Sequence, residues 1–168
     1  MEITSQILGL FGFLFFILSI QMKSKKTILL MQLISCVFYS VAYGLLGALS
    51  AVLIDIISIF RCSLFGYYDI KNKKSPIIIP IILVILSLLV GIYSYHNFYD
   101  IIPVVISIIY ILSTWQDNSL IIRLGFIIGA ILWIIYNLSV GAYTPMIGNF
   151  FEITSGIIAM IRLRKRKR

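Results

Sequence analysis

Apolar residues fill most of the chain, and short polar or charged stretches divide them into seven runs. The runs lie near residues 3–22, 27–46, 48–68, 76–95, 98–115, 120–140 and 142–162. Each is close to the roughly 20 residues that an α-helix needs to cross a bilayer. Strands of a membrane barrel would instead be about 10 residues long with alternating polarity. The pattern therefore predicts an all-α integral membrane protein with seven transmembrane helices.

Composition agrees with this prediction. The chain has 168 residues, of which 61% are hydrophobic and 12% are charged, whereas soluble domains are about 45–50% apolar and about 25% charged. Seven spanning helices use about 140 residues. We therefore expect a single membrane domain over residues 1–168, without a separate soluble domain.

The basic residues gather at three places along the chain. Lys23, Lys25 and Lys26 follow the first run, Lys71, Lys73 and Lys74 follow the third, and Arg162–Arg168 follows the seventh. Cytoplasmic loops are enriched in Lys and Arg, and seven crossings put all three groups on one side. This predicts an outside N-terminus and a cytoplasmic C-terminus. Topology then accounts for the net charge of +8, so nucleic acid is not an expected partner, whereas anionic lipid is one for the basic tail 162–168.

The two ends of the chain resemble each other when one is shifted by 94 residues. Ile17-Leu18-Ser19 then falls on Ile111-Leu112-Ser113, and Gly47-Ala48 falls on Gly141-Ala142. Internal repeats of this kind indicate a duplicated architecture. We expect repeat one at 3–70 and repeat two at 97–163, with a linker helix at 76–95. Because the linker crosses once, the two three-helix repeats are predicted to be parallel.

Ionisable residues inside predicted spans cost roughly 2.5–3.5 kcal/mol each on insertion scales and suggest a functional site, and three of them are strong cases. They are Asp55, Arg61 and Glu152. Arg61 and Glu152 fall at similar depths, so we expect a structural ion pair between them, which alone would explain their burial. Asp55 has no evident cationic partner at its depth. It is therefore the better candidate for a solute contact or a proton site.

Amide and aromatic side chains accompany these charges. Asn149 falls on Asp55 after the shift, and Trp133 falls on Tyr39. The aromatic pair is suited to stacking on a solute or gating a cavity, although packing alone also explains Tyr39. Asn137 is a buried amide that needs hydrogen-bond partners. Tyr43 lies near the outer end of its run, where anchoring at the membrane interface is a sufficient explanation.

The sequence contains none of the common catalytic motifs. There is no Walker loop, HExxH, GxSxG or cluster of His and Cys, so neither a nucleophile nor a metal set accompanies the carboxylates. Cys36 and Cys62 stand in apolar runs without CxxC spacing and are expected to be packing residues. We therefore expect no enzymatic activity, no metal and no cofactor.

Three segments resemble one family of membrane proteins. The segments Gly12–Lys26, Gly44–Arg61 and Trp133–Arg162 are similar to the YgjV family of bacterial inner-membrane proteins, and Trp-x-x-Tyr-Asn…Gly-x-Tyr is the most specific block. The resemblance implies a multi-pass location in the bacterial cytoplasmic (inner) membrane and no known activity.

A more distant resemblance concerns the three-plus-one-plus-three plan, which is similar to the SWEET sugar transporters and the PnuC vitamin transporters. SWEET proteins carry asparagines on helices three and seven, and here Asp55 and Asn149 match them. The acid at Asp55 and the additional acid Glu152 depart from a sugar carrier. They favour a cationic or proton-linked solute.

These observations lead to one main hypothesis, a small polar solute carrier or facilitator that works by alternating access. Its site would be lined by Asp55, Asn149, Glu152 and Asn137 and flanked by Tyr39 and Trp133. The alternative is a membrane scaffold or assembly partner that transports nothing, in which the charges hold the bundle together. A monomer would contain a complete pathway, and a homo-oligomer is an alternative.

Overall fold

The computed structural model describes residues 2–116 and 118–166, and only the backbone for residues 2, 119 and 163–166. The basic tail therefore lies largely outside the described side chains. The described residues form seven α-helices and contain no strand, so the all-α prediction is confirmed. They are α1 Glu2–Gln21, α2 Lys25–Leu45, α3 Leu49–Ile70, α4 Ile78–Tyr93, α5 Ile101–Trp115, α6 Ser119–Val140 and α7 Tyr143–Arg166, with a 3₁₀ turn, η1 Phe98–Asp100, before α5.

Six of the seven helical segments are long and apolar enough to cross a bilayer when η1 is counted with α5. The exception among the described helices is α4, which has 16 residues. At 1.5 Å per residue it is about 24 Å long, somewhat less than the hydrocarbon thickness of about 30 Å. Length and composition therefore identify six of the seven predicted spans.

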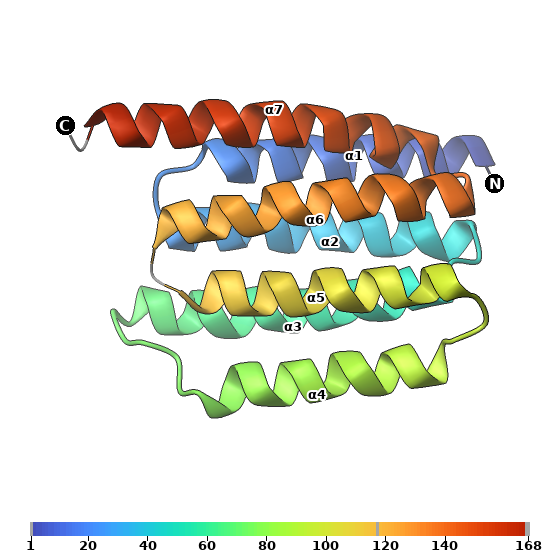
Figure 1. Ribbon diagram of the computed structural model, residues 1–168, viewed down its shortest axis with the longest axis horizontal. Helices are drawn as coiled ribbons and strands as arrows, with labels where there is room; N and C mark the ends of the chain where they lie inside the picture. Colours follow the sequence, from blue (N-terminus) through green and yellow to red (C-terminus); the bar gives the residue numbers. More distant parts are fainter. Residues whose placement is uncertain (1, 117, 167–168) are drawn as a thin grey trace.

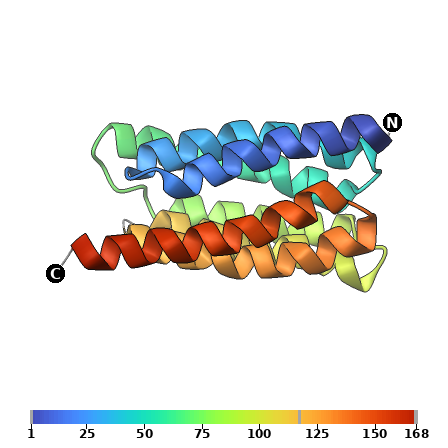
Figure 2. The same ribbon diagram turned by 90° about the horizontal axis from the view of Figure 1, so that it is seen from above.

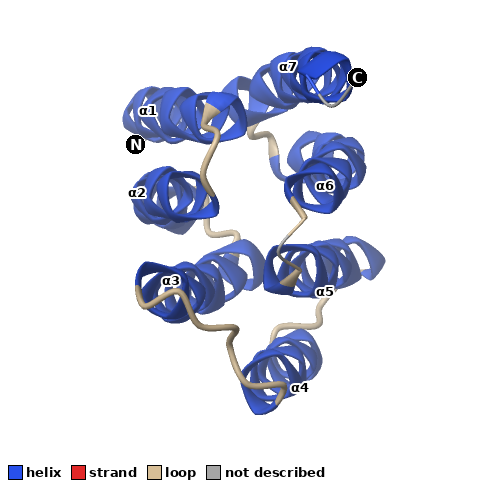
Figure 3. Ribbon diagram, turned by 90° about the vertical axis from the view of Figure 1, so that its left-hand side faces the viewer, coloured by secondary structure: helices blue, strands red, loops and turns tan. Residues whose placement is uncertain are grey.

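The helices form two facing rows with one helix outside them. Figure 3 shows α1, α2 and α3 in the first row and α7, α6 and α5 in the second, so that α1 lies beside α7 and α3 beside α5. Figure 2 separates the same two rows from another side. Helix α4 packs only against α3 and α5 among its main contacts. The interior of the molecule is therefore enclosed by six helices.

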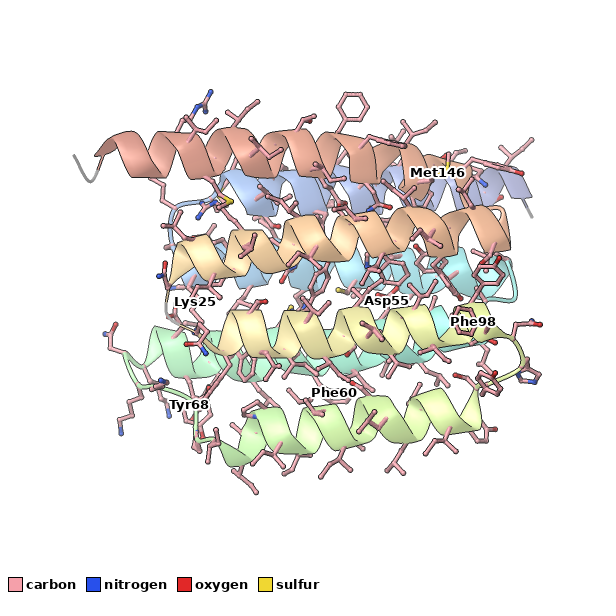
Figure 4. All side chains as sticks on the ribbon, viewed as in Figure 1. Lys25, Asp55, Phe60, Tyr68, Phe98 and Met146 are labelled. Atoms are coloured by element: carbon pink, nitrogen blue, oxygen red, sulfur yellow. The ribbon has the colours of Figure 1, made fainter. Side chains whose placement is uncertain are left out.

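Successive helices run in alternating directions, so the chain termini lie at opposite ends (Figure 1). Lys25 and Tyr68 mark one end, which also holds the C-terminus, and Phe98 marks the other (Figure 4). We call the first the basic end, because the Lys23–Lys26 and Lys71–Lys74 connections lie there. The opposite end is called the N-terminal end.

Two tight turns at the N-terminal end have the same construction. Gly47 and Gly141 adopt positive φ angles of 72° and 70°. After each glycine, the backbone amide of Ala48 or Ala142 donates to a carbonyl in the last turn of the preceding helix, that of Tyr43 (3.0 Å) or Asn137 (2.9 Å). Glycine tolerates this left-handed conformation without steric cost. Both hairpins are therefore closed with almost no loop.

Candidate functional site

Polar side chains inside the bundle line one cavity between the two helix rows. Its lining includes all six predicted solute-binding residues and Arg61: Tyr39, Asp55, Arg61, Trp133, Asn137, Asn149 and Glu152. They come from α2 and α3 in one row and α6 and α7 in the other, and Asp55 lies well away from both ends (Figure 4). Buried polar and charged groups at one place in an apolar bundle indicate a site rather than ordinary packing.

The cavity is narrow. The space that the centre of a water molecule can reach is about 30 Å³. One buried water needs about 10–15 Å³ by this measure, so the cavity has room for about two. A solute of several heavy atoms requires the two rows to separate.

A chain of hydrogen bonds crosses from one row to the other along the cavity wall. The Tyr43 hydroxyl donates to Oδ1 of Asn137 at 2.7 Å, and Nδ2 of Asn137 donates to Oδ1 of Asn149 at 2.9 Å. Nδ2 of Asn149 then donates to Oε2 of Glu152 at 3.0 Å. The chain fixes the orientation of both amides and supplies a donor to the Glu152 carboxyl inside the bilayer, which lowers the cost of burying it.

Tyr43 occupies a different place from the one its sequence position suggested. Its side chain is only 3% exposed, and its ring stacks on Trp133 with centroids 5.7 Å apart and an interplanar angle of 12°. The prediction of an interfacial anchor was wrong, because the hydroxyl finds its partner in Asn137 rather than at the membrane surface. The signal that could have found it is the spacing, since Tyr43 precedes Asn137 by 94 residues.

Several polar atoms of the cavity wall have no hydrogen-bond partner within the described part of the chain. They include Oδ2 of Asp55, Nε of Arg61, Nε2 of Gln32 and the Tyr39 hydroxyl. The Asp55, Arg61 and Gln32 side chains are at most 5% exposed. Buried polar groups normally have partners, so these unpaired atoms around one cavity need an explanation. They supply an acceptor and several donors to whatever enters the cavity.

Arg61 and Glu152 do not contact each other, although the sequence suggested an ion pair. The Arg61 guanidinium lies near Thr114 Oγ1 and Gln32 Oε1, each at 3.4 Å, and 5.4 Å from the centre of the Tyr110 ring. Glu152 is held by Asn149 instead. The two residues come from helices that lie diagonally across the bundle, because α3 packs mainly on α2, α4 and α5, and α7 on α1 and α6.

Other residues of the cavity wall have little or no signal in the sequence that indicates their place. Gln32 is fully buried, and its Oε1 accepts from the Arg61 guanidinium. Tyr110 carries the ring beside Arg61 and also stacks on Phe16 at 6.4 Å. Aromatic residues in apolar runs give no local signal for such a position. The 94-residue spacing relates Phe16 to Tyr110, however, and could have identified the pair.

Aromatic clusters close the cavity on both sides. Towards the N-terminal end, Tyr43 contacts Trp133 and Tyr136, whose rings are themselves 5.6 Å apart. Towards the basic end, Phe126 lies 5.5 Å from Phe16 and 5.3 Å from Tyr110. The polar cavity is therefore enclosed between one layer of aromatic rings towards the N-terminal end and another towards the basic end.

Hydrogen bonds beyond the first aromatic cluster tie the rows together at the N-terminal end. Ser50 donates to Oδ1 of Asp100 at 2.9 Å, and its oxygen lies 2.9 Å from the Tyr136 hydroxyl. On the other side, Oε1 of Gln6 accepts from the backbone amide of Thr144 at 2.9 Å. These contacts hold the N-terminal end closed.

Comparison with known proteins places the chain in a family. The family model described as "Imp-YgjV: Bacterial inner membrane protein" matches residues 3–167. No curated protein and no solved structure matches the chain. Since the family match covers nearly the whole sequence and the helices fit a multi-pass membrane protein, the chain belongs to the Imp-YgjV family of bacterial inner membrane proteins.

Proposed function

We propose that this protein is a carrier or facilitator for a small polar solute and that it works by alternating access. The observation that carries the proposal is the closed cavity with unpaired atoms on Asp55, Arg61 and Gln32, all of them buried. Unpaired buried groups are costly. Their cost is offset if a passing solute pairs with these groups in the cavity between the two helix rows.

Contacts between residues 94 positions apart support an internal duplication. Phe16 stacks on Tyr110, and Tyr43 bonds to Asn137. Two further hydrogen bonds are related by the same shift, which carries Gln6 to Asp100 and Ser50 to Thr144. Gln6 bonds to Thr144, and Ser50 bonds to Asp100. Such reciprocal contacts are expected of two parallel repeats about a pseudo-two-fold axis. Repeat-built transporters bind their substrates near the midplane at the repeat interface.

The chemistry of the cavity favours a particular class of solute. Asp55 and Glu152 supply two carboxyl groups, and Arg61 supplies one fixed positive charge. The unpaired Oδ2 of Asp55 is an acceptor, whereas the unpaired Nε of Arg61 and Nε2 of Gln32 are donors. A small solute that carries both a cationic or donor group and an acceptor group satisfies both sides. A proton on one carboxyl would balance the remaining charge and could couple transport to pH.

Access would alternate between the two aromatic clusters. Separation of the rows at Tyr43, Trp133 and Tyr136 opens the N-terminal end, and separation at Phe16 and Phe126 opens the basic end. The positive-inside rule makes the basic end cytoplasmic and the N-terminus external. The conformation described here is then the occluded one.

Ligand binding can be tested first, with purified protein in detergent. Thermal unfolding is measured with nucleosides, vitamins, sugars, amino acids and polyamines, at two pH values. A solute that binds the folded state raises the melting temperature. We expect one class to stabilise the wild type and not Asp55→Asn, while the control Asp69→Asn, which removes an acid at the end of α3 outside the cavity, behaves as wild type.

Transport is then measured as uptake of that solute into vesicles. Loss of a hydrogen bond to a charged group costs about 1.5–3 kcal/mol, so we expect Asp55→Asn and Glu152→Gln to slow uptake by about tenfold or more. Uptake equal to wild type in both variants would remove these residues from the mechanism. If no solute stabilises the protein and none is taken up, the carrier proposal fails and the scaffold alternative takes its place.

A further inference from the structure

A second cavity lies on the outside of the bundle, in a groove between α4 and α5 that is separate from the polar cavity. All of its lining residues are apolar or aromatic, and they are Ile77, Pro80, Ile81, Val84, Ile85, Leu112 and Trp115. Its volume is about 200 Å³. From Ile77 to Ile85 the groove follows α4 for about 12 Å, at 1.5 Å per residue. Several of its side chains, including Ile81 and Leu112, are about half exposed to the membrane.

The mouth of this groove lies at the basic end and carries positive charge. The indole N–H of Trp115 donates to the backbone carbonyl of Ser75 at 3.1 Å, which fixes the ring. The Lys74 ammonium lies 4.9 Å from the centre of the same ring. Lys73 is exposed beside it in the connection before α4. An aromatic ring with adjacent lysines is typical of the membrane–water interface.

We propose that the α4–α5 groove binds one acyl chain of an anionic phospholipid, whose phosphate group pairs with Lys74 and Lys73. Charge complementarity at the mouth selects the head group, since each basic residue near the surface contributes about 1 kcal/mol towards anionic lipid. The apolar lining accepts the chain. Helix–helix contacts in membranes are rich in small residues, whereas bulky Ile, Leu and Val line this groove, so a flexible chain fits it better than a partner helix.

The proposal can be tested with the full chain purified in detergent, independently of any transport. The protein is incubated with equal amounts of dioleoyl phosphatidylglycerol and dioleoyl phosphatidylcholine, and the lipids that stay bound are counted by native mass spectrometry. Two variants probe the site, Lys74→Gln at the mouth and Ile81→Trp in the groove. Two controls match them. Lys23→Gln removes a charge from the same end, and Ile158→Trp enlarges an equally exposed apolar residue on α7.

We expect the wild type to retain phosphatidylglycerol in preference to phosphatidylcholine. Lys74→Gln should retain about fivefold less phosphatidylglycerol, the equivalent of about 1 kcal/mol, and Ile81→Trp should lose it although every lysine is intact. Both controls should retain it as the wild type does. The proposal is overturned if the wild type does not discriminate between the lipids, if Ile81→Trp retains the anionic lipid, or if Lys23→Gln lowers retention as much as Lys74→Gln.

Discussion

The two helix rows share a framework and differ in the chemistry that they present to the cavity. Their matched features are the glycine turns at Gly47 and Gly141 and the reciprocal contacts at the N-terminal end. Their polar residues differ, because the 94-residue shift matches Asp55 in α3 with Asn149 in α7, and Arg61 with Ser155. Two rows of similar construction therefore carry an asymmetric set of charges. Matched positions can be tested in pairs, one from each row.

The largest difference is expected between Arg61 and Ser155. Arg61→Ala removes a cation that is 1% exposed and leaves two carboxyl groups in the cavity without it. Truncating a large, fully buried side chain costs about 2–5 kcal/mol, and the Thr114 and Gln32 oxygens lose their donor, so the free energy of unfolding should fall by about 3 kcal/mol or more. Ser155→Ala, near the surface, should change it by about 0.5 kcal/mol or less. Thermal unfolding in detergent measures both, and equal effects would show that Arg61 has no special role in the cavity.

An intermediate effect is expected at the bond that joins the rows. Tyr43→Phe keeps the ring that stacks on Trp133 but removes the donor to Asn137. An acceptor left unpaired inside the bundle costs about 1–3 kcal/mol, so we expect a lower free energy of unfolding by about 1–2 kcal/mol. Tyr67→Phe, at an exposed position on α3, is the control and should change it little. A Tyr43→Phe variant as stable as the wild type would mean that Asn137 finds another donor at once.

The smallest effect is expected at the two glycine turns, and it should be the same in both. Gly47→Ala and Gly141→Ala each place a side chain at a φ near 70°. The added Cβ meets no neighbouring atom within 4 Å at either position, so backbone strain of about 1 kcal/mol is the whole expected cost. Unequal losses of unfolding free energy would show that the rows differ in their framework as well as in their charges.

The sequence alone predicted the helices and the polar residues that line the cavity, and both predictions have a physical basis. Hydrophobic runs report helix length, and an ionisable or amide residue inside such a run has to face away from lipid. Asp55, Asn137, Asn149 and Glu152 all line the cavity as a result. The depth of each residue along its helix axis could also be predicted, since the rise per residue of an α-helix is fixed.

The partners of these residues could not be predicted in the same way. Arg61 and Glu152 are close in depth, but pairing also depends on which helices are neighbours, and α3 and α7 occupy diagonal places. For Tyr43 the sequence pattern was misleading in itself. A tyrosine near a helix end fits the interfacial pattern whether or not it has a buried partner such as Asn137. The similarity to SWEET and PnuC transporters stays a prediction.

Helix α4 contributes no side chain to the polar cavity. Its presence nevertheless determines the directions in which α5, α6 and α7 run. Helices α1 and α5 start from the same end because α4 carries the chain back across the length of the bundle (Figure 1). This single return passage gives α5, α6 and α7 the same directions as α1, α2 and α3. Without α4, the same three helices would run in the opposite directions. The polar residues of α3 and α7 would then lie at different heights in the bundle.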